Sequence, residues 1–113
     1  MDFRKQKSIY QQIADRLMDQ ILAGAPAEDD RMPSVRDVAA AMGVNPNTVM
    51  RSFDYLQSEE IINIRRGVGY FVCPDAKTKI LALQRREFLE EDAPIIRQKM
   101  KLLGISIEEL MAE

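Results

Sequence analysis

Apolar side chains recur every three or four residues along most of this chain, and that spacing predicts amphipathic helices. The first predicted helix starts after Ser8, which can cap it, and runs to about Ala23, where a glycine follows as a stop. Its apolar stripe, which we expect to face the core, consists of Ile9, Ile13, Leu17 and either Ile21 or Leu22. Tyr10 could reach a phosphate, but packing is the commoner role for such a tyrosine.

Residues 32–59 predict two short helices joined by a tight turn. Ser34 is placed to cap the first helix, and Asp37, three positions later, would complete a capping box. A glycine ends that helix, and the next begins with Asn45 as its cap and Pro46 in the first helical position. Helices with so short a connection must cross steeply, so this stretch predicts a helix-turn-helix.

The second of these helices has an apolar face and a polar face. At about 100° per residue, the packing face consists of Val49, Ser52, Phe53 and Leu56. The outward face consists of Asn47, Thr48, Arg51 and Tyr55. Amide, hydroxyl, guanidinium and phenol groups can bond to base edges and phosphate oxygens, as readout of the DNA major groove requires. On this face alone, an ordinary solvated helix surface explains the residues equally well.

A β-hairpin is predicted directly after this helix. Two runs of β-branched and aromatic residues, within 61–64 and 70–73, flank a turn that contains glycine. Arg65 and Arg66 would lie at the tip, and Gly67 would let the backbone approach DNA closely. A plain capping hairpin is the alternative, but its position directly after a helix-turn-helix favours a DNA-binding wing.

The remaining residues, 75–113, predict three more helices. One covers 77–91, a second restarts at an Asp and a Pro and covers 92–103, and a third opens at a capping box of Ser106 and Glu109. The apolar positions of the first two are Ile80, Leu81, Leu83, Phe88, Leu89, Ile95, Ile96, Met100 and Leu103. This is more apolar surface than an isolated tail can expose. It must pack on its own winged helix or on a second copy, and we favour the second copy.

Composition limits the remaining possibilities. With 113 residues, the chain can form one compact domain, predicted over 1–74, and a helical extension over 75–113. One cysteine and no histidine leave no internal disulfide and no structural zinc site, and no cofactor is expected. An enzyme is the weakest interpretation, because no nucleophile-base pair and no phosphate-cradling glycine loop is present. The acidic run 90–92 is interpreted as solvated rather than as a weak cation site.

The first residues carry charges and no apolar signal region, and no apolar run approaches a membrane span, so we expect a cytoplasmic protein with no membrane partner. The formal charge of −2 is the wrong sign for casual DNA affinity. Charge placement is more favourable, because acids cluster in the loop 28–30, where we expect them to be solvated or repelled from DNA. Four arginines, Arg36, Arg51, Arg65 and Arg66, lie in or beside the proposed DNA-contacting elements.

Residues 8–72, with the motifs PSVRDVA, GVNPNTV and RRGVGYFV, resemble the winged-helix DNA-binding domain of the GntR family of bacterial transcription regulators. The resemblance implies DNA contacts from Arg36, Pro46, Asn47, Thr48, Met50 and Gly67. Pro46 and Met50 stand where arginine is frequent in the family, so base reading is expected to shift to Asn47 and Arg51. The short helical tail resembles that of the YtrA subfamily, whose extensions dimerise.

Together these features predict a mainly α fold with a small β-hairpin, in which a winged helix-turn-helix is followed by a helical dimerisation segment. The expected function is that of a homodimeric repressor on a pseudo-palindromic double-stranded operator, and a protein-binding winged helix is the alternative. Any small-molecule effector is expected at the dimer interface. The residues predicted to contact DNA are Ser34, Arg36, Asn45, Pro46, Asn47, Thr48, Met50, Arg51, Tyr55, Arg65, Arg66 and Gly67.

Overall fold

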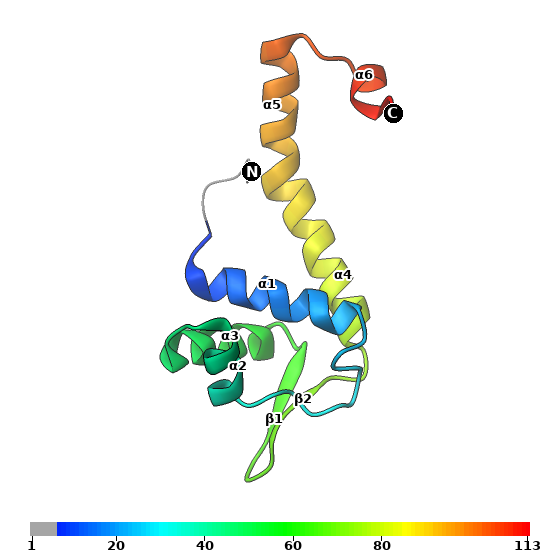
Figure 1. The fold of residues 1–113 in the computed structure, drawn as a ribbon. Coiled ribbons are helices and arrows are strands. Elements are labelled where there is room, and N and C mark those ends of the chain that lie inside the picture. The colour runs from blue at the N-terminus through cyan, green and yellow to red at the C-terminus, as the bar shows by residue number, and fades with distance from the viewer. Residues whose placement is uncertain (1–6) are drawn as a thin grey trace. The chain divides into compact units, whose positions relative to one another are not determined.

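The computed structural model describes residues 7–113, which fall into two compact units, 7–82 and 83–113 (Figure 1). The first unit runs past the predicted domain boundary at residue 74 and includes the start of the next helix. Its elements are α1 (Ile9–Leu22), α2 (Val35–Met42), α3 (Pro46–Ser58), β1 (Ile62–Arg65) and β2 (Gly69–Val72). The predicted fold class, mainly helical with one small hairpin, is confirmed.

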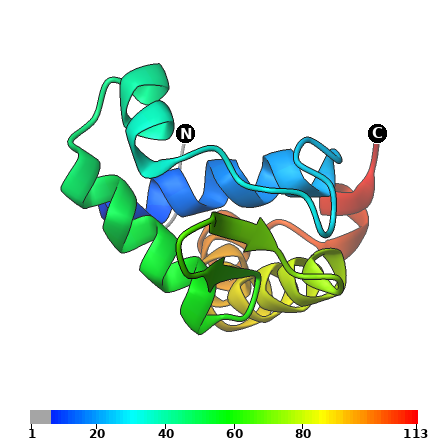
Figure 2. The same cartoon turned by 90° about the horizontal axis from the view of Figure 1, so that it is seen from below.

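Helix α1 is the packing helix that the sequence predicts. The Ser8 amide donates to the Gln11 side chain at 3.3 Å, and the buried stripe includes Ile13, Leu17 and Ile21. Ile9 was wrongly assigned to this stripe: it is 55% exposed, because core contacts begin one turn later. Figure 2 shows α3 crossing α1 at a steep angle.

The helix-turn-helix has the predicted caps with one difference. Ser34 Oγ accepts a hydrogen bond from the Asp37 amide at 3.0 Å, but among the described residues the Ser34 amide donates no bond to the Asp37 carboxylate. The aspartate side chain is one methylene shorter than the glutamate of a full capping box. Gly43 ends α2 with φ +65°, and the predicted packing face of α3 is fully buried at Val49, Ser52, Phe53 and Leu56.

The hairpin is antiparallel, with register from Ile62 opposite Val72 to Arg65 opposite Gly69. The other edge of β2 also has a backbone partner, which the sequence does not predict: Arg31 forms a single β-bridge with Phe71. The amides of residues 32 and 72 donate to the carbonyls of 70 and 30, at 2.8 and 2.9 Å. Residue 31 therefore acts as a one-residue third strand that partly covers the edge of β2.

In the acidic loop before α2, Asp29 and Asp30 are exposed, as expected for solvated acids, and two acids of the loop also have partners in the protein. The Asp30 carboxylate accepts the amide of Ala27 at 3.2 Å, which closes the loop on itself. The Glu28 carboxylate accepts the amide of Lys77 at 3.3 Å, at the start of α4 (Ala76–Glu87). A carboxylate at a helix N-terminus is stabilised by the unpaired amides there.

The first residues of α4 are anchored within the first unit. Lys79 donates to the carboxylate of Glu60 and lies 3.9 Å from that of Asp75. Ile80, in the part of α4 that belongs to this unit, is fully buried. Ile80 and, in the second unit, Leu83 were predicted to contact a second subunit. This is wrong for these two residues, because they are already buried within one chain, at 0% and 4% exposed, and have no surface left to offer a partner.

The second unit continues through the π-helix η1 (Phe88–Asp92) into α5 (Ala93–Leu103), and α6 (Ile107–Met111) follows. The predicted break at Asp92 and Pro94 is therefore wrong. Pro94 has no amide to donate, and the wider π turn, in which Ala93 donates to the Phe88 carbonyl, accommodates that loss without ending the helix. The predicted end at Gly104, with φ +67°, and the Ser106 capping box of α6 are confirmed.

Candidate nucleic-acid interface

The first turn of α3, the reading helix, is held by a cap and open to solvent. The Asn45 side-chain oxygen accepts the Asn47 amide at 2.8 Å, which leaves the NH₂ group of Asn45 able to donate elsewhere. Pro46, Asn47 and Met50 are exposed, whereas Thr48 is half-buried. This turn thus has the exposure and the fixed backbone that base reading requires.

The reading helix is joined to the hairpin, here called the wing (residues 61–73), through Tyr70. The Tyr70 ring meets Phe53 edge-on with centroids 4.9 Å apart, and its hydroxyl lies 3.6 Å from the sulfur of Met50. These contacts set the position of the wing relative to the exposed turn of α3. This role of Tyr70 was not predicted, because the sequence shows only the aromatic character of the strand.

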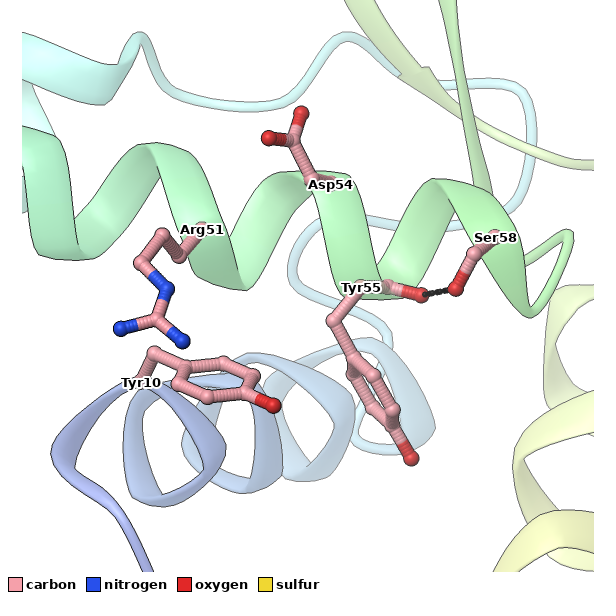
Figure 3. Close-up of a pocket in the computed structure, with 5 residues that line it drawn as sticks. All are labelled: Tyr10, Arg51, Asp54, Tyr55 and Ser58. Atoms are coloured by element: carbon pink, nitrogen blue, oxygen red, sulfur yellow. Dashed lines mark hydrogen bonds between the residues drawn. The ribbon is translucent and has the colours of Figure 1, made fainter.

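Arg51 and Tyr55 point from α3 toward α1 (Figure 3). The Arg51 guanidinium lies 4.4 Å from the ring centroid of Tyr10, and the Tyr10 and Tyr55 rings meet edge-on at 6.4 Å. With Asp54 and Ser58 they line an open pocket of about 300 Å³. Arg51 must leave this cation–π contact, worth about 0.5–1 kcal/mol at an exposed site, before it can read a base, so its base-reading role stays a prediction.

The start of α2 offers a second group of donors. Arg36 is exposed in the first turn, and no ion pair involves it among residues 7–113. Ser34 Oγ is occupied as an acceptor by the cap, but its hydroxyl hydrogen remains available to a phosphate oxygen. The amides at this helix end add a partial positive charge.

The wing differs from its predicted form at one residue. Arg65, expected at the tip, ends β1 opposite Gly69, and its guanidinium lies 3.8 Å over the ring of Phe71. Arg66 and Gly67 form the turn itself, where Gly67 has φ +75° and no neighbouring atom within 4 Å of an added Cβ. The open turn therefore allows close approach of the backbone to a partner.

The perturbed titratable groups are Cys73, at the end of the wing away from its turn, and the pair Glu60 and Lys79. Burial, with the charge of Asp75, raises the pKa of the Cys73 thiol, so the nucleophilic thiolate is disfavoured. The hydrogen bond from Lys79 lowers the pKa of Glu60, and the same bond raises the pKa of Lys79. Within the described residues, no three His, Cys, Asp or Glu side chains converge to hold a metal ion.

A helix-turn-helix followed by a two-stranded wing defines the class of this protein as a winged helix-turn-helix DNA-binding regulator. Residues 9–72 match the model of the bacterial regulatory proteins of the gntR family, and the chain belongs to that family. The resemblance seen in the sequence is confirmed. Members are DNA-binding transcription regulators and not enzymes.

Similar proteins extend the match beyond the DNA-binding domain. The transcriptional regulator YhcF of Bacillus subtilis is 32% identical over 96% of this chain and 88% of its own length. The transcriptional repressor YtrA of the same species is 31% identical over 97% of this chain and 84% of its own. A GntR-family regulator structure from Bacteroides thetaiotaomicron is 48% identical, with a TM-score of 0.78, and covers 91% of this chain and 89% of that one. The helical extension therefore has counterparts in its relatives.

None of the helices in residues 7–113 has both the length and the apolar character needed to cross a membrane.

Proposed function

We propose that this regulator is a homodimeric repressor that binds a pseudo-palindromic operator. Each subunit would insert the first turn of α3 into a major groove, and half-sites would lie about one helical turn apart. Arg36 and the wing would hold the flanking phosphates. Repression is proposed because YtrA, 31% identical over most of both chains, is named a repressor.

The main support for a dimer is the exposed apolar surface of the C-terminal unit, residues 83–113. No residue of α5 or α6 is buried within one chain, although both helices are rich in leucine, isoleucine and methionine. Leu102, Leu103 and Met111 are 83%, 67% and 73% exposed. An exposed apolar surface of this kind is typical of an interface between subunits. Most soluble oligomers are built from identical chains, so we take a second copy of this chain as the partner.

A small-molecule effector, where one acts, would bind at the interface between two copies. The C-terminal unit, 83–113, is too small to enclose an ordinary metabolite pocket in one subunit. The open pocket beside Tyr10 and Arg51 is a poor alternative site, because its openness to solvent disfavours tight binding of a metabolite.

The assembly is tested by light scattering on the whole protein at micromolar concentration. We expect the mass of a dimer for the wild type and for Gln98→Glu, a charge change at an exposed polar position of α5. We expect a monomer for Leu103→Glu, because an unpaired carboxylate would be buried in the interface. A monomeric wild type, or a Leu103→Glu protein that stays dimeric, would contradict this use of α5.

DNA binding is tested with a duplex of about 30 base pairs, long enough for two half-sites, selected by the wild-type protein from a random pool. We expect a symmetric footprint and an affinity that falls steeply as salt rises. A salt slope near zero would instead support a winged helix that binds protein.

A further inference from the structure

Arg31 is a basic residue beside the wing that the sequence did not single out. It lies outside the helices and strands, between the acidic loop and α2, and its backbone bridges to Phe71. Its side chain is exposed. Side chains opposite each other in paired strands share a face, so Arg31 and Phe71 project on the same side of the wing.

The Arg31 guanidinium occupies the space over Gly69. A Cβ added at Gly69 would lie 3.0 Å from Arg31 Nε and 3.2 Å from Arg31 Nη2, and the glycine has φ +143°. Gly69 is two residues before Phe71 and is paired with Arg65. The alternation of strand side chains therefore places Arg31, Phe71 and Arg65 on one face, with Gly69 as the gap that admits a guanidinium.

Within the described part of the chain, the two cations on this face have no acidic partner. Among residues 7–113, no ion pair involves Arg31 or Arg65. The nearest acid in sequence, Asp30, turns its carboxylate back to the Ala27 amide. Arg31 and Arg65 flank β2 from its two sides and share one face. Like charges repel, so an anion bound between the two guanidinium groups would stabilise this arrangement.

We propose that Arg31 and Arg65 together bind one backbone phosphate of the DNA, with Gly69 leaving room for the Arg31 guanidinium. We call these three residues the wing clamp. Guanidinium groups suit this task because their donors match phosphate oxygens. The inference rests on the proposed DNA-binding function and adds to it a contact that lies outside the reading helix and the wing turn.

The test measures affinity and salt slope on the selected duplex described above. We expect Arg31→Gln to lower affinity at least about tenfold, the effect of losing a hydrogen bond to a charged group. The control Arg16→Gln removes the same charge from an exposed position of α1 and should bind like the wild type. If Arg31→Gln binds like Arg16→Gln, Arg31 does not contact DNA.

A shared phosphate is tested with the double variant Arg31→Gln/Arg65→Gln. If the two arginines share one phosphate, the slope of log affinity against log salt should be less steep than that of the wild type by about 0.9 per subunit. If each arginine binds its own phosphate, the difference should be about 1.8 per subunit. Gly69→Ala should weaken binding in the wild-type background and add nothing in Arg31→Gln. A slope loss near 1.8, or an equal Gly69→Ala effect in both backgrounds, would overturn the clamp.

These outcomes are separate from failure of the proposed function. If the wild type shows no salt-dependent binding to any selected duplex, both the function and the clamp are wrong. If the wild type binds DNA and the Arg31 variants bind it equally tightly, the proposed function stands and only the clamp is rejected. Circular dichroism of each variant checks that the fold is retained.

Discussion

Replacement of Met50 by arginine tests where the reading helix meets DNA. Met50 is 39% exposed on the N-terminal half of α3, and its sulfur contacts only the hydroxyl of Tyr70 among hydrogen-bonding groups in the described chain. Methionine and arginine have similar helix propensities, so Met50→Arg should fold normally. If this turn enters the groove as proposed, the new guanidinium would project toward a phosphate or a guanine.

The magnitude follows from the number of phosphates neutralised. One additional phosphate contact per subunit should steepen the salt slope by about 0.9, or about 1.8 for a dimer with two reading helices. A fourfold rise in salt would then cost the variant about 12-fold more affinity than it costs the wild type. A single bound subunit predicts about 3.5-fold, so the same titration counts the reading helices on the DNA.

Fluorescence anisotropy with the selected duplex, at several salt concentrations, measures both slopes. The matched control is Gln20→Arg, which adds the same charge at an exposed position of α1. We expect Gln20→Arg to leave the slope close to that of the wild type, because net charge alone changes long-range attraction and adds no contact. Equal slopes for Met50→Arg and Gln20→Arg would refute the placement of this turn in the DNA groove.

Further predictions concern stability and reactivity. Ser52→Ala removes the buried hydrogen bond from Ser52 Oγ to the Tyr10 carbonyl at 2.7 Å, so thermal unfolding at fixed protein concentration should show a loss of about 1 kcal/mol and a Tm lower by about 4–8 °C. Glu60 has a lowered pKa when folded, so its bond to Lys79 stabilises the protein above about pH 4.5 and loses this effect as pH falls through the folded pKa. The Glu60→Gln variant should therefore be less stable than the wild type at pH 7 and equally stable in strong acid. Denaturant unfolding at each pH measures this difference. Cys73 has a raised thiol pKa, so alkylation at pH 7.5 should be slower in the folded protein than in denaturant, and equal rates would contradict this assignment.

Local chemistry made the helix-turn-helix predictable. The caps Ser34 and Asn45, the stop at Gly43 and the buried face of α3 depend on neighbours within four residues, which a sequence pattern records directly. The wing was predictable for the same reason, because short-range turn chemistry joins its two strands.

The features that were missed depend on contacts between distant residues. Arg31 pairs with Phe71 across 40 positions, and no periodic pattern marks a strand of one residue. Ile80 has the spacing of any apolar helix residue, so the sequence could not tell burial in its own chain from burial in a partner. Pro94 does lack a backbone amide, as the sequence indicates, but the π turn before it allows the helix to continue.

The acidic balance of the chain, −2 at pH 7, is compatible with DNA binding once the partners of its charges are considered. Three acids of the DNA-binding unit have partners in the protein: Glu28 and Asp30 accept hydrogen bonds from backbone amides, and Glu60 accepts one from Lys79. The arginines at α2 and the wing form no ion pairs within residues 7–113. Local potential at a binding surface depends on such uncompensated charges more than on the total. Because screening shortens the reach of each charge to about 8–10 Å at moderate salt, a small cluster of free guanidinium groups can attract phosphate even though the whole molecule is negative.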